Sequence, residues 1–151
     1  FDAIFIIRQW LNDGKIVISN RYVSANMGHQ GSKIRDEEER KKFFSWLNDL
    51  EYNIFKIPKP DINLILHLDP RAAQKLVDNK TNNREYLNSA KRDIHENDLE
   101  HLQLAEQIFL AIAKTFPNFI LIESVKDGQI MTRQEINNLI WQEVKQLINT
   151  P

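Results

Sequence analysis

Residues 57–70 have the sequence Ile-Pro-Lys-Pro-Asp-Ile-Asn-Leu-Ile-Leu-His-Leu-Asp-Pro, and this stretch decides the fold of the chain. The prolines exclude a helix at its start, because each restricts its own backbone and that of its predecessor. The apolar run 62–68 predicts a strand buried on both faces, as is typical of parallel sheets. Asp69 is placed to cap a helix, and Pro70 suits the first helical position. The stretch therefore predicts a strand followed at once by a helix.

The rest of the chain continues this alternation. Short apolar runs at 15–20 and 119–123 predict two further buried strands. Apolar residues at three- and four-residue spacing predict helices, which we expect over 1–13, over 36–52, up to about 114, and after 132. Residues 21–33 are expected to be a loop that leads into a helix, and residues 78–92 a mobile loop. Strands joined by helices predict an α/β fold with a mainly parallel sheet, in which residues 1–151 form part of a single domain.

Helix ends are marked by residues suited to them. Gly14 is a C-terminal stop, and the acidic cluster 36–39 suits the positive N-terminal end of a helix. Thr132 and Glu135 have the spacing of a capping box.

The composition restricts the class of protein. The chain has 151 residues, of which 42% are hydrophobic and 27% charged, as in an ordinary globular domain. Its formal net charge of -1 gives no overall field to attract nucleic acid or a membrane, so any anion site has to be local. The absence of cysteine excludes disulfides and thiolate metal sites. No apolar run reaches the roughly 20 residues of a membrane helix. We therefore expect a cytoplasmic protein without nucleic-acid or membrane partners.

A phosphate site is expected where the first strand ends, because ligands of such folds lie at the carboxyl ends of strands. Residues 19–30 read Ser-Asn-Arg-Tyr-Val-Ser-Ala-Asn-Met-Gly-His-Gln. A guanidinium at position 21 can bind a phosphate bidentately, and the Asn26 amide can bind the edge of a base. The alternative is that Arg21 is a structural ion-pair partner. Asp69 and residues 124–128 follow the other two strands.

The two segments together resemble the thymidylate kinases, a family of P-loop nucleoside monophosphate kinases. Asn20-Arg21-Tyr22 and the polar residues after it are similar to the family's Asp-Arg-Tyr/His motif, and residues 57–70 are similar to its Pro-Lys-Pro-Asp lead into a core strand. The resemblance covers essentially the whole chain. It implies a three-layer parallel sheet of strand order 2-3-1-4-5, transfer of the γ-phosphoryl group of ATP to dTMP with Mg²⁺, and a homodimer.

The resemblance also implies a role for each matching residue. Arg21 would hold the phosphate of dTMP and act in catalysis, Asn26 would face the thymine, and His29 would lie near the sugar. Ser24 and Gln30 belong to the same substrate-binding segment.

A lid over the transferred phosphoryl group is implied for the basic segment that follows the second strand. Arg84 would be the lid cation, and Glu96 would help to close the nucleotide site. The alternatives to Arg84 are basic residues of the same segment: Lys80, Lys91 and Arg92. One well-placed cation can accelerate phosphoryl transfer by roughly 10³ to 10⁵. The alternative is that the segment is a solvated loop.

Two features depart from the family pattern. Asn20, in a catalytic position, stands where the family generally has Asp, which removes a charge near the phosphates. None of the four glycines has the spacing of a P-loop. We therefore expect the P-loop and the first two strands to lie upstream of this chain, which by itself would be inactive. The absent P-loop strand would lie between residues 15–20 and 62–68, and the kinase interpretation requires these two runs to enter one sheet.

Several alternatives remain open. The chain could belong to another nucleotide or deoxynucleoside kinase of the superfamily, or to a non-catalytic interaction domain derived from one. His67 is interpreted as a satisfied core histidine, and the acidic and histidine residues at 93–101 as a helix start without a dedicated metal site. The tryptophans Trp10, Trp46 and Trp141 are expected in the core or at subunit contacts, and residues 1–13 and 22–33 are the candidate dimer face.

Overall fold

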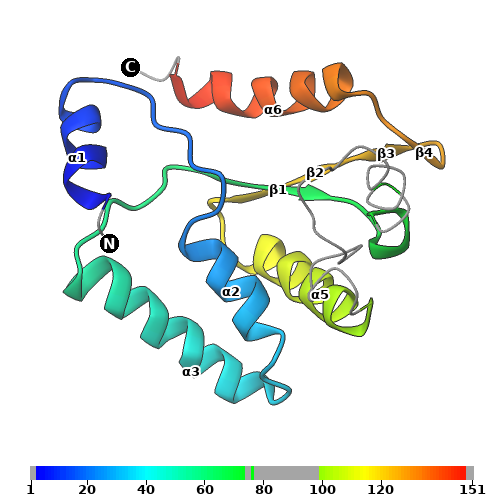
Figure 1. Ribbon diagram of the computed structural model, residues 1–151, viewed down its shortest axis with the longest axis horizontal. Helices are drawn as coiled ribbons and strands as arrows, with labels where there is room; N and C mark the ends of the chain where they lie inside the picture. The colour runs from blue at the N-terminus through cyan, green and yellow to red at the C-terminus, as the bar shows by residue number, and fades with distance from the viewer. Residues whose placement is uncertain (1–2, 74–75, 77–98, 149–151) are drawn as a thin grey trace, which may run out of the picture. The chain divides into compact units, whose positions relative to one another are not determined.

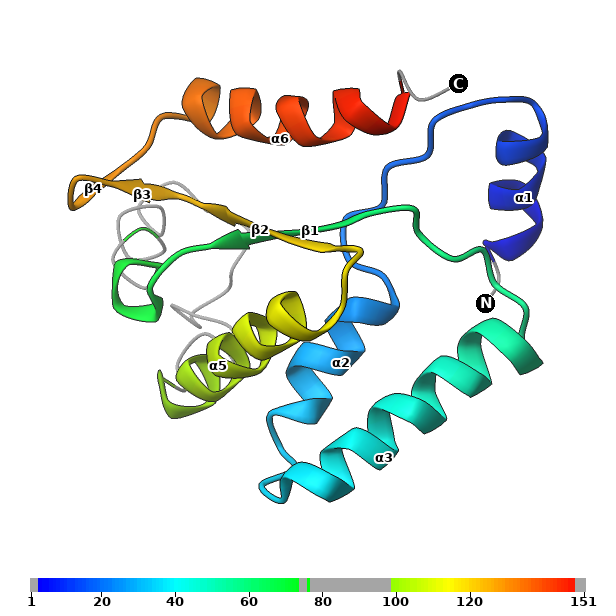
Figure 2. The ribbon, with the colours of Figure 1, turned by 180° about the vertical axis from the view of Figure 1, so that it is seen from behind.

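The computed structural model describes residues 3–73, 76 and 99–148. The chain divides into two compact units, Phe1–Asp61 and Ile62–Pro151, and each is described by itself (Figures 1 and 2). That all residues share a single domain stays a prediction.

The first unit is helical in its described part. Its elements are α1 (Ile4–Asn12), α2 (Val23–Gly31), α3 (Glu37–Asn48) and a π-helical turn η1 (Asp49–Ile54), which continues α3 without a break. Gly14 ends α1 with a φ of 72° and donates its backbone N–H to the Leu11 carbonyl, so the predicted stop is confirmed. The predicted helix over 36–52 is also confirmed, with its last turns in π form.

Helix α2 occupies most of residues 21–33, which were predicted to be a loop that leads into a helix, so the helix starts earlier than expected. It packs against α3 and buries Val23, Met27 and Gly31, which are spaced four residues apart and so share one face. Leu47 is buried on α3. The apolar stripe of α2 is narrow, and the polar residues around it conceal the helical period.

Helix α3 begins as the acidic cluster predicts. The Asp36 side chain caps it by accepting a 2.8 Å hydrogen bond from the Glu39 backbone N–H. Glu37, Glu38 and Glu39 occupy the first turn, where negative charge is favourable.

The second unit contains a parallel pair of strands, β1 (Asn63–His67) and β2 (Phe119–Glu123), in a register that sets His67 opposite Glu123. Helix α5 (Leu99–Thr115) covers one face of this pair and α6 (Arg133–Ile148) the other (Figures 1 and 2). The buried core residues are Ala105, Ile108, Ile112 and Ile122. The predicted mixed α/β fold with a small parallel sheet is therefore confirmed, including both of these strands and both helices.

A short hairpin between β2 and α6 was not predicted. Strands β3 (Val125–Lys126) and β4 (Gln129–Ile130) are antiparallel and joined by Asp127 and Gly128. Both joining residues have positive φ, 51° and 76°, as a two-residue type I′ turn requires. The Asp-Gly pair was the sequence evidence for this turn.

The capping box at the start of α6 is confirmed. The Glu135 carboxylate accepts hydrogen bonds from the Thr132 hydroxyl at 2.7 Å and the Thr132 backbone N–H at 2.8 Å. In return the Thr132 hydroxyl accepts from the Glu135 N–H at 3.2 Å. These bonds hold the pKa of Glu135 below its ordinary value.

The prediction of a buried strand at 15–20 is wrong. These residues form no strand, and Ile16 and Ile18 are 66% and 91% exposed. A strand is stable only when a neighbour pairs with its backbone groups, and the described residues give this run no such neighbour. Residues 57–69 and 15–20 therefore do not share a sheet in the described part, so this requirement of the kinase interpretation is not met there, and the interpretation depends on other observations. The complete strand order, with its missing strands, stays a prediction.

Two further predictions are tested by the described residues, one on the tryptophans and one on membrane helices. Trp10, Trp46 and Trp141 are 38%, 57% and 54% exposed, so they are not core residues as one interpretation had it. Among the helices that the structure describes, none combines the length and the apolar character needed to cross a membrane.

Candidate functional site

The turn before α2 holds Arg21 in a conformation that few residues adopt. Its φ is 69°, in the left-handed region that is costly for a residue with a Cβ. The Ser19 hydroxyl donates a 2.8 Å hydrogen bond to the Arg21 carbonyl across the turn. Such backbone conformations persist only where their surroundings hold them, and they are frequent at binding sites.

The guanidinium of Arg21 lies against α2. Its Nη2 atom is 3.3 Å from Nε2 of His29, two turns along the helix, so it can donate to a neutral imidazole. Arg21 is exposed, and His29 is half-buried. The structure thus brings together the predicted phosphate ligand and the residue predicted to lie near the sugar.

The other predicted substrate residues are also on α2. Asn26 and Gln30 are exposed, and Asn26 neighbours both His29 and Gln30 on the helix surface, at three- and four-residue spacing. Ser24 is half-buried in the first turn. Asn20 is exposed and adjoins Arg21 in the same bend.

This arrangement is suited to an anion that carries an apolar or aromatic group. The guanidinium offers planar donors that match a phosphate, and the N-terminal end of α2 starts two residues after it, where the helix dipole favours negative charge. Amide side chains follow one to two turns along the helix, where they could bind a ring edge.

Tyr22 is a residue of this region that the sequence analysis did not single out. It is the N-cap residue of α2, and its hydroxyl donates a 3.0 Å hydrogen bond to the carbonyl oxygen of Pro58. The bond joins the Asn-Arg-Tyr segment to the Pro-Lys-Pro segment. The sequence contained only weak evidence for this hydrogen bond, namely that the carbonyl groups of a proline-rich stretch have no hydrogen-bond partners within the stretch.

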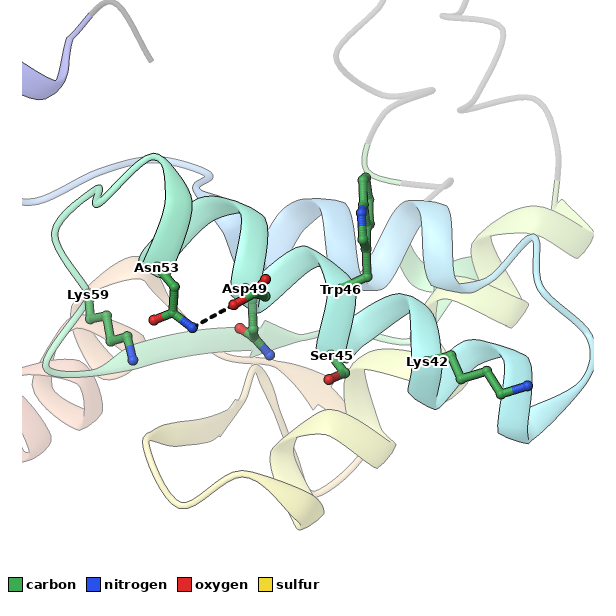
Figure 3. A pocket seen from close by; sticks show the side chains of 7 residues that line it. Lys42, Ser45, Trp46, Asp49, Asn53 and Lys59 are labelled. Atoms are coloured by element: carbon green, nitrogen blue, oxygen red, sulfur yellow. Dashed lines mark hydrogen bonds between the residues drawn. The ribbon is translucent and has the colours of Figure 1, made fainter.

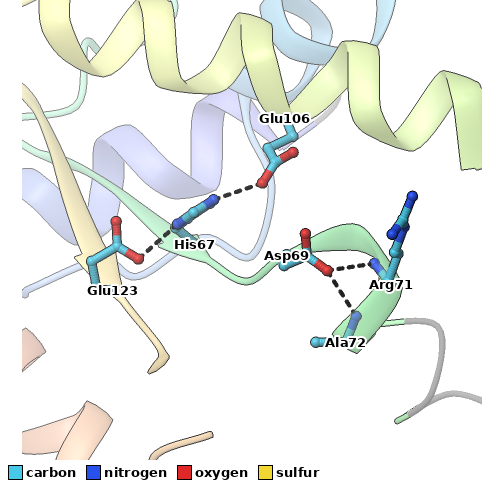
Figure 4. Close-up of polar contacts among 6 residues, drawn as sticks. All are labelled: His67, Asp69, Arg71, Ala72, Glu106 and Glu123. Carbon is cyan, nitrogen blue, oxygen red and sulfur yellow. Dashed lines mark hydrogen bonds and ion pairs between the residues drawn. The ribbon is translucent and has the colours of Figure 1, made fainter. Parts of the chain in front are cut away.

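A second polar cluster lies in the other unit, at the carboxyl ends of β1 and β2 (Figure 4). His67 bridges two carboxylates, with Nδ1 2.7 Å from Glu123 of β2 and Nε2 2.8 Å from Glu106 of α5. Burial acts to lower the pKa of His67, but the hydrogen bonds to Glu123 and Glu106 outweigh it and raise the pKa above its ordinary value. The prediction of a satisfied histidine is confirmed, although its side chain is 22% exposed and not fully in the core.

Asp69 and Ser124, at the two other predicted ligand edges, have structural roles. The Asp69 carboxylate accepts hydrogen bonds from the backbone N–H groups of Arg71 and Ala72 at 2.9 and 3.1 Å (Figure 4), which confirms it as a helix cap. Ser124 is buried, and its N–H donates to the His67 carbonyl at 2.9 Å.

An open pocket of about 640 Å³ lies along α3 and η1 (Figure 3). Its lining is mainly polar: Lys42, Ser45, Trp46, Asn48, Asp49, Asn53 and Lys59. Asn53 donates a 2.8 Å hydrogen bond to Asp49 within it. None of the predicted site residues lines this pocket.

The lid residues and the nucleotide-closing residue lie outside the described residues: Lys80, Arg84, Lys91, Arg92 and Glu96. Within residues 3–73, 76 and 99–148, no three His, Cys, Asp or Glu side chains gather closely enough to hold a metal ion. No described residue is therefore assigned to the Mg²⁺ that the resemblance implies.

Comparison with curated proteins gives relatives of one kind. A thymidylate kinase of Clavibacter michiganensis is 25% identical over 145 residues, which are 95% of this chain and 60% of that protein. A probable thymidylate kinase of Thermococcus kodakarensis is 27% identical over 133 residues, 87% of this chain and 55% of that protein. A probable thymidylate kinase of Pyrobaculum aerophilum is 33% identical over 67 residues, 44% of this chain and 30% of that protein.

No family model matches the chain. The chain spans between 30% and 60% of the length of these relatives, and the similarity is low throughout. All three matches nevertheless carry the same name, and two of them run through most of the chain, from the Arg21 region to α6. The chain is therefore similar to thymidylate kinases, and the matches support a thymidylate kinase-like family.

Proposed function

We propose that this chain is the part of a thymidylate kinase that binds dTMP, the acceptor of the γ-phosphoryl group of ATP in the reaction that gives dTDP. The observation that carries the proposal is the Arg21 turn, in which a strained backbone presents an exposed guanidinium beside α2. The names of the three relatives support a nucleotide kinase.

The binding mode follows from the positions of the side chains on α2. The Arg21 guanidinium would bind the phosphate of dTMP through paired hydrogen bonds and give up part of its contact with His29. Asn26 would accept and donate hydrogen bonds at the thymine edge, with Ser24, His29 and Gln30 beside the sugar and base. Asn20 can donate a hydrogen bond to a phosphate oxygen without bringing a negative charge near it.

The remaining parts of the reaction are assigned to groups outside the described residues. ATP and Mg²⁺ are the proposed cosubstrate and cofactor; the metal would neutralise phosphate charge in the reaction. Arg84, or one of its alternatives Lys80, Lys91 and Arg92, would supply the lid cation, and Glu96 would help to close the site. The proposal includes a homodimer that uses residues 1–13 and 22–33, where Phe5 and Ile6 are 73% and 47% exposed.

The test is dTMP binding measured by calorimetry. Arg21→Ala removes two charge-assisted hydrogen bonds and should weaken dTMP binding by about 100-fold. Arg35→Ala removes an exposed arginine outside the turn and should leave the affinity within about twofold of the wild type. The proposal fails if the two variants bind dTMP equally well.

A panel of ligands separates the alternatives. Tighter binding of dUMP, dCMP or thymidine than of dTMP would favour another nucleotide or deoxynucleoside kinase. A folded chain that binds none of these ligands would favour the non-catalytic interaction domain. An ADP-release assay with ATP, Mg²⁺ and the preferred acceptor then tests phosphoryl transfer itself. We expect no activity from the chain alone and activity from the chain supplied with the P-loop segment.

A further inference from the structure

The hydrogen bond from Tyr22 to Pro58 connects two segments 36 residues apart that otherwise have no shared secondary structure. Tyr22 directly follows Arg21 in the chain and starts α2, and Pro58 lies in the irregular stretch after η1. Both residues are half-buried, so the bond is partly shielded from water.

The Pro58 carbonyl needs a donor from elsewhere. An extended proline-containing stretch makes no internal backbone hydrogen bonds, and prolines have no N–H to share. The Tyr22 hydroxyl meets this need, and α1 contributes a second anchor nearby, since Arg8 donates to the Lys56 carbonyl. The 56–60 stretch is thus held by two hydrogen bonds, one from α1 and one from the first residue before α2.

A second tyrosine supports the same stretch. The Lys59 ammonium lies 5.3 Å from the centre of the Tyr52 ring, within the range of a cation–π contact, and Tyr52 belongs to η1. Burial raises the pKa of Tyr52 to about 12, with contributions from Tyr22 and Glu51. Burial, and then Glu51, also raises the pKa of Tyr22. Tyr22 therefore keeps its proton, and remains a donor, throughout the neutral range.

These contacts bear directly on Arg21. Its left-handed backbone is unfavourable and persists only while the residues on both sides are held. On one side the Ser19 hydroxyl holds the Arg21 carbonyl, and on the other Tyr22 is tied to Pro58. Without the second restraint the turn could relax to an ordinary φ, which would redirect the guanidinium away from His29.

We propose that Tyr22 is a positioning residue: its hydrogen bond to the Pro58 carbonyl fixes the turn that aims the Arg21 guanidinium along α2. The proposal rests on the proposed function only in assigning that guanidinium to the phosphate of dTMP. It gives the Pro-Lys-Pro segment a role in the site, as the support of the residue next to Arg21.

The test compares two tyrosine-to-phenylalanine variants of the chain. Tyr22→Phe keeps the ring and removes the donor to Pro58. Tyr52→Phe, the matched control, removes a half-buried hydroxyl in the same unit and keeps a ring beneath Lys59. The first readout needs no nucleotide: the imidazole NMR signals of His29 report the contact with the guanidinium, and Arg21→Ala shows how they move when it is lost.

The expected result is that Tyr22→Phe moves the His29 signals in the direction of Arg21→Ala, and Tyr52→Phe does not. The second readout is dTMP affinity, which should fall about fivefold in Tyr22→Phe, as for one neutral hydrogen bond, and less than twofold in Tyr52→Phe. In the Arg21→Ala background, Tyr22→Phe should have no further effect on affinity, because residues that act through one group are not additive.

The outcomes are distinct. Unchanged His29 signals in Tyr22→Phe, or fully additive losses in the double variant, would overturn the positioning role. A Tyr22→Phe chain that does not fold would also overturn it, since the hydroxyl would then serve the whole unit. If the His29 signals respond as expected and no form of the chain binds dTMP, the positioning role stands and the proposed function fails.

Discussion

The turn around Arg21 and the cluster around His67 use charge in opposite ways. His67 has a carboxylate on each ring nitrogen, at 2.7 and 2.8 Å, and its partners come from β2 and α5. Among the residues that the structure describes, the guanidinium of Arg21 contacts Nε2 of His29 at 3.3 Å, and Arg21 is exposed. His67 joins elements of the fold, whereas Arg21 presents its guanidinium at the surface.

The difference indicates which cluster can serve a ligand. A charge whose partners are built into the protein adds to stability, and a ligand would have to displace those partners. A cation held by its backbone and not by a carboxylate can accept an anion at little cost. The comparison therefore predicts that substitutions at the two sites affect different quantities: stability at His67 and affinity at Arg21.

The largest expected effect on stability comes from His67→Ala. This change leaves Glu106 and Glu123 facing each other without the imidazole, and we expect a loss of about 2 kcal/mol in the free energy of unfolding. The affinity for dTMP should change less than twofold. Urea denaturation and calorimetry of the same preparation check both values, with Arg21→Ala, stable but weak in binding, as the opposite case. A His67→Ala chain that is as stable as the wild type would remove the distinction between the two regions.

The dependence of stability on pH sharpens the same comparison. The pKa of folded His67 is raised above the value of about 6.5 for an unfolded chain, so the protonated form is the one that folding favours. Its contribution is complete below that value and is lost as the pH rises through the folded pKa. We expect about 1 kcal/mol of stability to disappear between pH 6 and pH 9 in the wild type but not in His67→Gln.

The quantity to measure is the difference in unfolding free energy between the wild type and His67→Gln at each pH, because the other titratable groups are the same in both chains. The groups that face His67 are Glu123 from the neighbouring strand and Glu106 from α5. A wild-type curve parallel to that of His67→Gln would show that the imidazole is neutral in the fold.

The smallest effects separate the two glutamates. The Glu106 side chain is 23% exposed and that of Glu123 is 55% exposed, so water weakens the second ion pair more. Glu106→Gln should lower the free energy of unfolding by about 1 kcal/mol at pH 6, and Glu123→Gln should lower it by only about 0.3 kcal/mol. If urea denaturation showed equal losses of unfolding free energy in the two variants, burial would not decide which of the two ion pairs is stronger.

The parallel pair of strands was predictable because its evidence is local. The apolar runs 62–68 and 119–123 are bounded by helix caps that the structure confirms, Asp69 directly after the first and Thr132 nine residues after Glu123. The run 15–20 has the same composition and forms no strand. Composition shows that a segment is able to pair, whereas pairing itself depends on a neighbour, which for β1 is β2, far away in sequence.

The site was predicted in its residue types but not in its geometry. The sequence indicated Arg21 and His29 as parts of one motif, yet their contact depends on α2, which the polar pattern concealed. The link from Tyr22 to Pro58 could not be predicted, because it depends on how α2, η1 and the proline stretch pack within the first unit. The roles of Arg84 and Glu96 stay predictions.

The exposure of Ile16 and Ile18 has a practical consequence. Lys15-Ile-Val-Ile-Ser19 is a strand-forming sequence that has no sheet partner among the described residues and exposes apolar side chains, which is the usual starting point of edge-to-edge aggregation. At high concentration the segment is expected to pair with like segments from other chains. Lys15, the one charged residue within it, has its ammonium 3.4 Å from the Asp13 carboxylate, which offsets the charge that would oppose this pairing. Preparations of the chain will therefore keep best when dilute.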